Sequence, residues 1–269
     1  MPELTVGQFS LVYNAFSFTF AAMLATFAFL ILSRGEVAPK YRVALTLSSL
    51  VVLIAGYHYL RIFESWDAAF AFTDGVYVAT GAQFNDAYRY IDWLLTVPLL
   101  VAELVAVLGL ARRQAGWMTF RLGTAAALMI ILGYPGEVAT DTGTRLLWGT
   151  LSTIPFVYIL YVLFAQLGDT IQKQPDNVRV LLRNARLLLL ATWGFYPIVF
   201  LLPVLTGGAV SATAGVLVAV QVGYVIADVA AKCGYGILIF FIARAKSESE
   251  QAAEPMLQNA RQTAPAVGR

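Results

Sequence analysis

Ionisable residues interrupt two long apolar stretches of the sequence. Asp92 and Glu103 share one stretch, and Asp228 and Lys232 share another. Ionisable groups inside a bilayer are costly, and they usually face the interior of a helix bundle and serve a function there. A lysine amine that desolvation keeps neutral can form a Schiff base with an aldehyde, and carboxyl groups beside it can take up and deliver protons. These residue types therefore point to proton transfer around a covalently bound aldehyde.

Helical spacing would align these groups across a membrane. Four polar residues of the first stretch fall on one helix face: Arg89, Asp92, Thr96 and Glu103. Asp228 and Lys232 are four residues apart and again share a face. Glu103 follows Asp92 by 11 residues, which is about 16 Å along a helix at about 1.5 Å per residue. We therefore expect a carboxyl group on either side of a mid-membrane lysine.

A simpler interpretation is that Asp228 and Lys232 form only a structural ion pair between helices. That interpretation leaves Glu103 without a basic partner in its own helix. It also leaves unexplained a second acid, Asp92, where one acid already matches the lysine. The aligned set is better explained as a proton path.

Aromatic side chains accompany the charged set. Four of them lie near the level of Asp92 and Lys232: Trp93, Trp193, Tyr196 and Tyr224. Such rings would suit a flat, conjugated ligand. Without the lysine, ordinary packing would explain them equally well.

The elements that position these residues must be membrane helices. Of the 269 residues, 59% are hydrophobic and only 13% are charged, and the mean hydropathy is +0.72. An average soluble protein has about a quarter of its residues charged, so a soluble fold is excluded. Apolar stretches near the ~20 residues that cross a bilayer predict an all-α membrane protein with a seven-helix bundle. We expect the helices over 8–33, 43–63, 87–110, 116–137, 146–168, 186–205 and 211–243, and a short strand or hairpin over 77–81.

The distribution of positive charge predicts the orientation of the bundle. With the N-terminus outside, 14 of the 18 Lys and Arg residues fall in cytoplasmic segments and three in outer segments, as the positive-inside rule requires. We expect a multi-pass protein of a cell membrane, the inner membrane of a bacterium, with a cytoplasmic C-terminus. Residues 1–245 would form one domain, and the polar residues 246–269 a disordered cytoplasmic tail. The start has no basic segment or cleavage site, so we expect no removable signal peptide.

Three motifs on three of these helices resemble those of microbial rhodopsins. They are RYIDWLLTVPLL at 89–100, WGFYP at 193–197 and DVAAKCGYG at 228–236. The resemblance covers about residues 8–245 and implies all-trans retinal bound to Lys232 as a protonated Schiff base. It further implies Asp92 as counterion and proton acceptor, Asp228 as second counterion and Arg89 on their outer side. The retinal pocket implied by the family comprises Trp93, Leu100, Met129, Trp193, Tyr196 and Pro197.

One triplet places the chain within that family. Asp92, Thr96 and Glu103 resemble the Asp-Thr-Glu set of proteorhodopsins and xanthorhodopsins. This resemblance implies a light-driven outward proton pump, with Glu103 as cytoplasmic proton donor, rather than a chloride pump, a sodium pump or an enzyme. The alternative is a photosensory rhodopsin that signals through a partner protein. Leucine at position 100 goes with green absorption in related pumps.

Two further residues carry a structural and a functional interpretation. His58 is the single histidine; it would be structural by default, but similar pumps have a histidine here that pairs with the counterion. Gly149 would be a helix-packing glycine by default, but xanthorhodopsin has glycine here, which opens a window for a carotenoid antenna.

We expect a homo-oligomer (pentamer or trimer) in the lipid bilayer, with protons as the transported ion and with no metal site and no nucleic-acid partner. Loop 206–215 contains no acid, so the proton release group is not identified.

Overall fold

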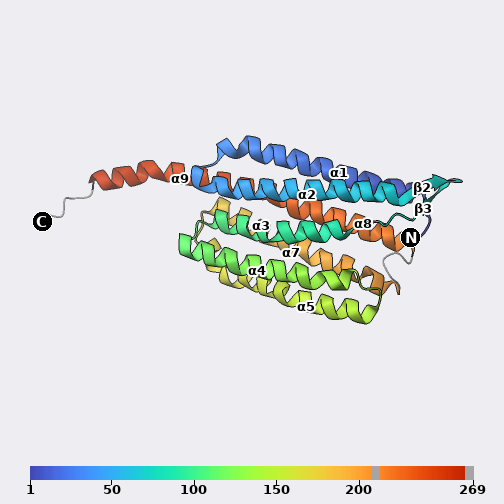
Figure 1. Ribbon diagram of the computed structural model, residues 1–269. Helices are drawn as coiled ribbons and strands as arrows, with labels where there is room; N and C mark the ends of the chain where they lie inside the picture. Colours follow the sequence, from blue (N-terminus) through green and yellow to red (C-terminus); the bar gives the residue numbers. More distant parts are fainter. Residues whose placement is uncertain (208–212, 264–269) are drawn as a thin grey trace.

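The computed structural model describes residues 1–207 and 213–263 of the chain. Within these residues, seven helical spans are long and apolar enough to cross a membrane, which confirms the all-α, seven-helix expectation. They pack as an elongated bundle, with the N-terminus at one end and the last helix projecting from the other (Figure 1). The helices are α1 (Val6–Leu32), α2 (Arg42–Ala69), α3 (Ala87–Leu108), α4 (Arg112–Glu137), α5 (Thr142–Tyr161), α6 (Gly168–Gln172), α7 (Asp176–Leu205), α8 (Ala214–Asp228) and α9 (Tyr235–Thr263).

The seventh span is interrupted at its centre. A π-helical segment, Val229–Gly234, joins α8 to α9 and contains Lys232. A second π-helical segment, Val162–Gln166, continues α5 towards the short α6. Wider π-turns occur often at functional sites, and the first of these places the central lysine. Short 3₁₀ turns, Ser33–Glu36 and Pro39–Tyr41, connect α1 to α2.

A small sheet covers the same end of the bundle as the N-terminus (Figure 1). Strands β2 (Phe70–Thr73) and β3 (Val76–Ala79) form a hairpin, and β1 (Leu4–Thr5) adds to β3, all antiparallel. The turn residues Asp74 and Gly75 have φ values of 51° and 89°, a conformation that glycine adopts readily and aspartate tolerates. The predicted hairpin is therefore present, centred slightly earlier than expected.

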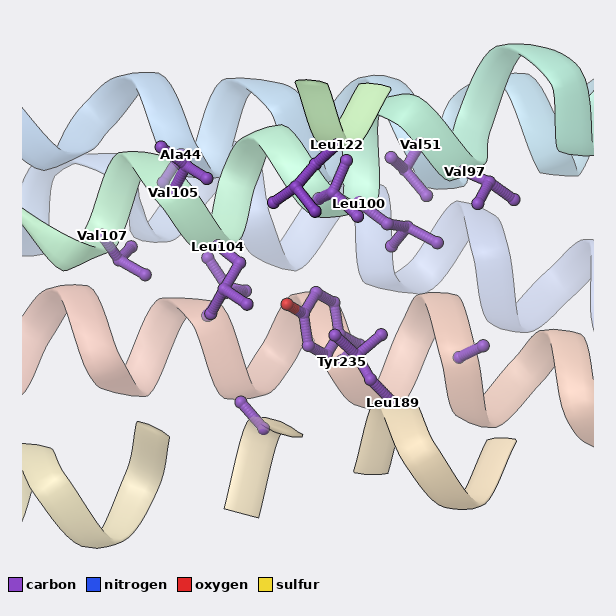
Figure 2. Close-up of a cluster of buried hydrophobic side chains, with 14 of the residues drawn as sticks. Ala44, Val51, Val97, Leu100, Leu104, Val105, Val107, Leu122, Leu189 and Tyr235 are labelled. Atoms are coloured by element: carbon purple, nitrogen blue, oxygen red, sulfur yellow. The ribbon is translucent and has the colours of Figure 1, made fainter. Parts of the chain in front are cut away.

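Buried apolar side chains fill the bundle beyond Lys232, at the level where α9 begins. Leu100 and Leu104 of α3, Leu189 of α7 and Tyr235 of α9 meet there, and each is at most 1% exposed (Figure 2). Glu103 lies on α3 between two of these leucines. The core therefore isolates that carboxyl group from water.

Several helices extend beyond their predicted bounds, and α7 and α9 do so by the most residues. α7 begins at Asp176 rather than at 186, because its first turns are polar and hydropathy does not report an exposed helix. The prediction of a disordered tail is wrong for residues 246–263, which continue α9; residues 264–269 and the predicted helix start at 211–212 lie outside the described residues. The division of the chain at residue 245 stays a proposal.

Polar contacts explain why the last helix continues. Lys246 Nζ donates to the Leu108 carbonyl at 3.1 Å, and Ser247 Oγ accepts from the Ala38 amide at 2.8 Å. Glu250 accepts a hydrogen bond from Tyr41 at 2.6 Å. These contacts attach the polar segment to the ends of α2 and α3, and they depend on tertiary neighbours that composition does not report.

Candidate functional site

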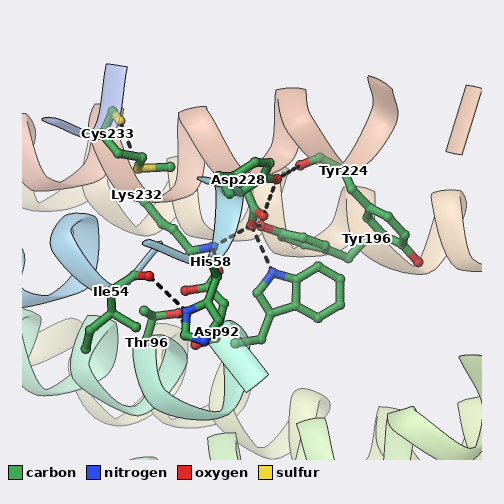
Figure 3. A network of polar contacts seen from close by, with 12 residues as sticks. Ile54, His58, Asp92, Thr96, Tyr196, Tyr224, Asp228, Lys232 and Cys233 are labelled. Atoms are coloured by element: carbon green, nitrogen blue, oxygen red, sulfur yellow. Dashed lines mark hydrogen bonds and ion pairs between the residues drawn. The ribbon is translucent and has the colours of Figure 1, made fainter. Parts of the chain in front are cut away.

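The Lys232 amine lies between two carboxylates at the centre of the bundle (Figure 3). Its Nζ is 2.5 Å from Asp92 Oδ2 on α3 and 2.8 Å from Asp228 Oδ1, one turn earlier in the seventh span. All three side chains are at most 1% exposed. With Arg89, which is also buried, the set contains two cations and two anions. A buried cluster that sums to zero is the arrangement that a low dielectric favours.

Asp228 is the better satisfied of the two carboxylates. Tyr59 donates to it at 2.6 Å and Trp93 Nε1 at 3.0 Å, and the Tyr196 hydroxyl donates as well. By contrast, Asp92 Oδ1 is buried and has no hydrogen-bond partner among the described residues. Hydrogen bonds to a carboxylate favour its charged form. Asp228 is therefore built to stay ionised, and Asp92 is the carboxylate better placed to accept a proton.

Thr96 and His58 surround Asp92 without binding its carboxylate. Thr96 Oγ1 donates to the Asp92 backbone carbonyl at 2.8 Å. His58 Nδ1 lies 2.9 Å from the Ile54 carbonyl, and the imidazole is close enough to Asp92 for their charges to interact (Figure 3). With Nδ1 donating to Ile54, Nε2 is the nitrogen left for the counterion. No hydrogen bond joins His58 and Asp92, both described residues, so their pairing stays a proposal.

Arg89 turns away from the central carboxylates. Its Nη2 donates to Gln221 Oε1 at 2.8 Å, and its guanidinium lies 4.9 Å from the centre of the Tyr224 ring. All three side chains are at most 2% exposed. Arg89 therefore contacts Gln221 and Tyr224, one turn before Asp92 on α3.

Glu103 has a single protein partner among the described residues. The Ser48 hydroxyl of α2 donates to its Oε2, whereas its Oε1 is buried without a partner. The Tyr235 hydroxyl, in the same layer, is also buried and unpartnered among the described residues. A carboxyl group in such surroundings favours its neutral, proton-carrying form, which suits a proton donor.

A cavity of about 270 Å³ adjoins Lys232. Every residue predicted to contact the chromophore lines it: Trp93, Leu100, Met129, Gly149, Trp193, Tyr196 and Pro197. Most of the lining is aromatic or aliphatic, with the amine of Lys232 among it. The apolar lining and the single amine therefore fit an elongated apolar aldehyde that attaches to the lysine.

Gly149 lies at the α5 side of this cavity. A Cβ atom on Gly149 would approach Phe200 Cε1 to 2.8 Å, so the phenyl ring of α7 already occupies the space that the glycine leaves. Leu146 and Thr150, exposed on the outer surface of α5, line the same cavity. The cavity therefore extends from the lysine to the lipid-facing side of α5, with Phe200 beside the glycine.

Several polar partners escaped the sequence reasoning: Ser48, Tyr59, Glu137 and Gln221. Tyr59 follows His58 directly, and Gln221 lies seven residues before Asp228, on the same helix face; these spacings are signals that could have been used. Glu137 ends the helix predicted over 116–137, and nothing in the sequence set it apart from the acids of the outer loops. The structure buries it at the end of α4, 2.9 Å from Arg145.

Comparisons with known proteins agree with this geometry. The model of the bacteriorhodopsin-like protein family matches residues 12–246. The chain is 30% identical over 232 residues to green-light absorbing proteorhodopsin from Gamma-proteobacterium EBAC31A08, covering 85% of each chain. It superposes on xanthorhodopsin, described as a light-driven ion pump with dual chromophore, with a TM-score of 0.89 and 61% identity over 93% of this chain and 99% of the other. For a thermophilic rhodopsin, the TM-score is 0.88 and the identity 54%, with the same coverage.

Proposed function

The chain belongs to the bacteriorhodopsin-like protein family, and we propose that it is a light-driven pump that moves protons out of the cell. Microbial rhodopsins bind retinal in a seven-helix membrane bundle, so the chain is a multi-pass membrane transporter and not an enzyme. The proposed orientation, with the N-terminus outside, follows from the positive-inside rule. It places Asp92 on the outer side of Lys232 and Glu103 on the cytoplasmic side.

The apolar cavity beside Lys232 supports binding of all-trans retinal to this lysine. Bound there as a protonated Schiff base, retinal supplies the absorption of light and the isomerisation that starts each cycle. Trp93 and Trp193 hold the apolar walls of the cavity, and Tyr196 connects the wall to Asp228 by its hydroxyl. These groups exclude water and fix where the Lys232 nitrogen points.

The observation that carries the proposal is the buried Lys232 with a carboxyl group on either side along the membrane axis. Lys232 Nζ gives its proton to Asp92 Oδ2, which is 2.5 Å away. Asp228 keeps its charge, held by three donors, and balances Arg89. Asp92 regains its charge when a proton leaves to the outside. Glu103 delivers a proton to Nζ from the cytoplasmic side and refills from the cytoplasm, so one proton crosses per cycle.

The test is expression in cells supplied with all-trans retinal. We expect coloured cells that acidify the medium on illumination, an effect that stops in the dark. Coloured cells without any light-driven pH change would favour the photosensory alternative. Colourless cells would contradict the assignment of the lysine and its cavity.

Glu103→Gln should leave the dark colour nearly unchanged, because the residue lies about 16 Å along the helix from Asp92. Return of the proton to Lys232 should slow by about 10²-fold, the contribution typical of a positioned acid, and added azide, a small acid, should partly restore the rate. Flash spectroscopy of purified protein measures this return. Glu36→Gln, which removes an exposed carboxylate at the same end, is the matched control. An unchanged return in Glu103→Gln would place the donor elsewhere.

We further propose that the cavity accommodates a carotenoid against Gly149, and that the chain assembles as a pentamer or trimer. The extension of the cavity to the lipid-facing side of α5 supports the carotenoid, as does the similarity to xanthorhodopsin, described as having a dual chromophore. Because Phe200 lies where a Gly149 side chain would be, its ring would form one wall of the carotenoid site.

Gly149→Trp should abolish carotenoid binding while the protein still binds retinal and pumps, since Gly149 carries no proton. The measurement is a structured blue absorption band after incubation with hydroxylated and keto carotenoids, together with the pumping action spectrum. Gly116→Trp, at a glycine with no neighbouring side chain within 4 Å, controls for the bulk of the indole. If the wild type shows no band with any carotenoid, Gly149 is only a packing glycine and the proton-pump proposal stands without the antenna.

A further inference from the structure

Glu137 is a buried carboxylate that the central site does not use. It ends α4, at the proposed outer end, and its side chain is 8% exposed. Arg145 Nη2 donates to Glu137 Oε2 at 2.9 Å, and the Tyr224 hydroxyl approaches the two carboxylate oxygens at 3.3 and 3.4 Å. Acidic side chains at helix ends are usually exposed to solvent. The burial of Glu137 therefore indicates a role beyond solvation of the helix end.

Helix packing does not require the Glu137 carboxylate. Arg145 already donates Nε to the Phe200 carbonyl at 3.0 Å, and Nη1 to the Gly136 and Glu137 carbonyls at 3.4 and 3.0 Å. Backbone acceptors alone therefore attach α5 to α4 and α7. The carboxylate adds one short hydrogen bond to Arg145, and among the described residues its other oxygen has only the long contact with Tyr224.

Tyr224 links this carboxylate to the central site. Its hydroxyl points to Glu137, while its ring lies 4.9 Å from the Arg89 guanidinium and packs against Trp93 at 5.2 Å. The Asp92 counterion, Arg89 and the Glu137 carboxylate thus follow one another from the lysine towards the outer end.

Unpartnered polar atoms follow the same route. Among the described residues, Asp92 Oδ1, Arg89 Nε and Gln221 Nε2 are buried with no hydrogen-bond partner. Buried polar atoms of this kind are the ones that internal water satisfies, typically with about three hydrogen bonds per molecule. Water molecules bound to these atoms would connect the Asp92 carboxyl group, by hydrogen bonds, to the region around the Tyr224 ring.

The buried charges between Lys232 and Glu137 sum to zero. The charged and titratable groups whose fields reach it are Asp86, Arg89, Arg145, Tyr90 and Tyr224. Counting from Lys232 to Arg145, three buried cations face three buried anions. When the proton of Lys232 has moved to Asp92, its onward transfer to Glu137, the one of these three buried carboxylates at the proposed outer end, restores the charge on Asp92.

We propose that Glu137 is the outer relay of the exported proton. The O–H bond of protonated Asp92 breaks, and the proton passes along water and the Tyr224 hydroxyl to form an O–H bond on Glu137. Glu137 then loses that proton to the outer medium and re-forms its ion pair with Arg145, so each group returns to its starting state. This inference rests on the proposed proton-pump function.

The test is flash photolysis of the retinal-loaded full chain in liposomes with a membrane-impermeant pH dye on the outer side of the protein. Time-resolved infrared spectra of carboxylic acid bands are recorded in parallel. Glu137→Gln should delay the dye signal by roughly tenfold or more, since a positioned proton carrier contributes about 10²–10⁴-fold. It should also remove one transient carboxylic acid band, whereas Glu137→Asp should keep a shifted band. Deprotonation of Lys232 should keep its wild-type rate.

Glu64→Gln is the matched control, because Glu64 is an outer acid paired with an arginine but half exposed. This variant should release protons at the wild-type rate. If Glu137→Gln matches the wild type in dye timing and infrared bands, the relay is overturned, and a lowered melting temperature alone would identify a structural ion pair.

If Glu137→Gln fails to fold, ¹³C labelling of glutamate in Glu103→Gln protein is the deciding experiment. A transient carboxylic acid band that does not shift with the label overturns the relay. A wild type that releases no proton outside would instead refute the pump itself.

Discussion

Lys232→Ala protein should remain colourless after all-trans retinal is added. The substitution removes the amine between Asp92 and Asp228, with which an aldehyde would form an imine. It also leaves two buried carboxylates without their shared cation, which costs about 3–5 kcal/mol unless they take up protons. Absorption spectra of purified protein and melting temperatures measure both effects.

Two comparisons separate a missing amine from a misfolded protein. Lys246→Ala removes another buried lysine of the seventh span, outside the cavity, and should stay coloured. A preformed imine of retinal with a small alkylamine should return colour to Lys232→Ala, because the cavity walls remain. A normal visible band in Lys232→Ala with free retinal alone would refute the attachment site.

Asp92→Asn should shift absorption to the red and stop pumping. The Asp92 carboxylate, 2.5 Å from Nζ, stabilises a positive charge on the nitrogen more in the dark state than after excitation, when the charge moves away from it. Its removal therefore lowers the excitation energy. Proton export should fall by at least about 10²-fold, because the acceptor of the Lys232 proton is gone. Spectra and light-driven external pH changes test the two parts separately.

Asp169→Asn, which changes an exposed carboxylate outside the site, should retain the wild-type colour and the wild-type pH signal. Asp228 cannot substitute for Asp92 in this scheme, because three donors hold it in its charged form. Light-driven acidification that persists in Asp92→Asn would therefore rule out Asp92 as the acceptor.

The sequence predicted the helices and the line of charged groups because both depend on local rules. Apolar length identifies a membrane helix, and spacings of three, four and seven residues put Arg89, Asp92, Thr96 and Glu103 on one face of α3. Lys232 stands out because a mid-membrane amine is rare. The motifs around these residues then indicated retinal before any contact was known.

Contacts between helices that are distant in sequence could not be predicted from the sequence. Tyr59 reaches Asp228 across 169 positions of sequence, and Arg89 reaches Gln221 across 132; no spacing rule brings such pairs together. Glu137 ends the helix predicted over 116–137, but its burial against Arg145 depends on how α4 and α5 pack, which no local pattern reports. Phe200 fills the space beside Gly149 for the same reason, since the two residues meet only when α5 and α7 pack.

The most direct test of proton export is the effect of a protonophore on the light-driven pH change of retinal-loaded cells. If protons are the pumped ion, the medium acidifies in light, and the protonophore abolishes the signal because exported protons return at once. The signal should also persist when sodium and chloride are replaced by larger ions. An alkaline signal that grows with protonophore would mean that protons follow another pumped ion passively, and it would contradict the account.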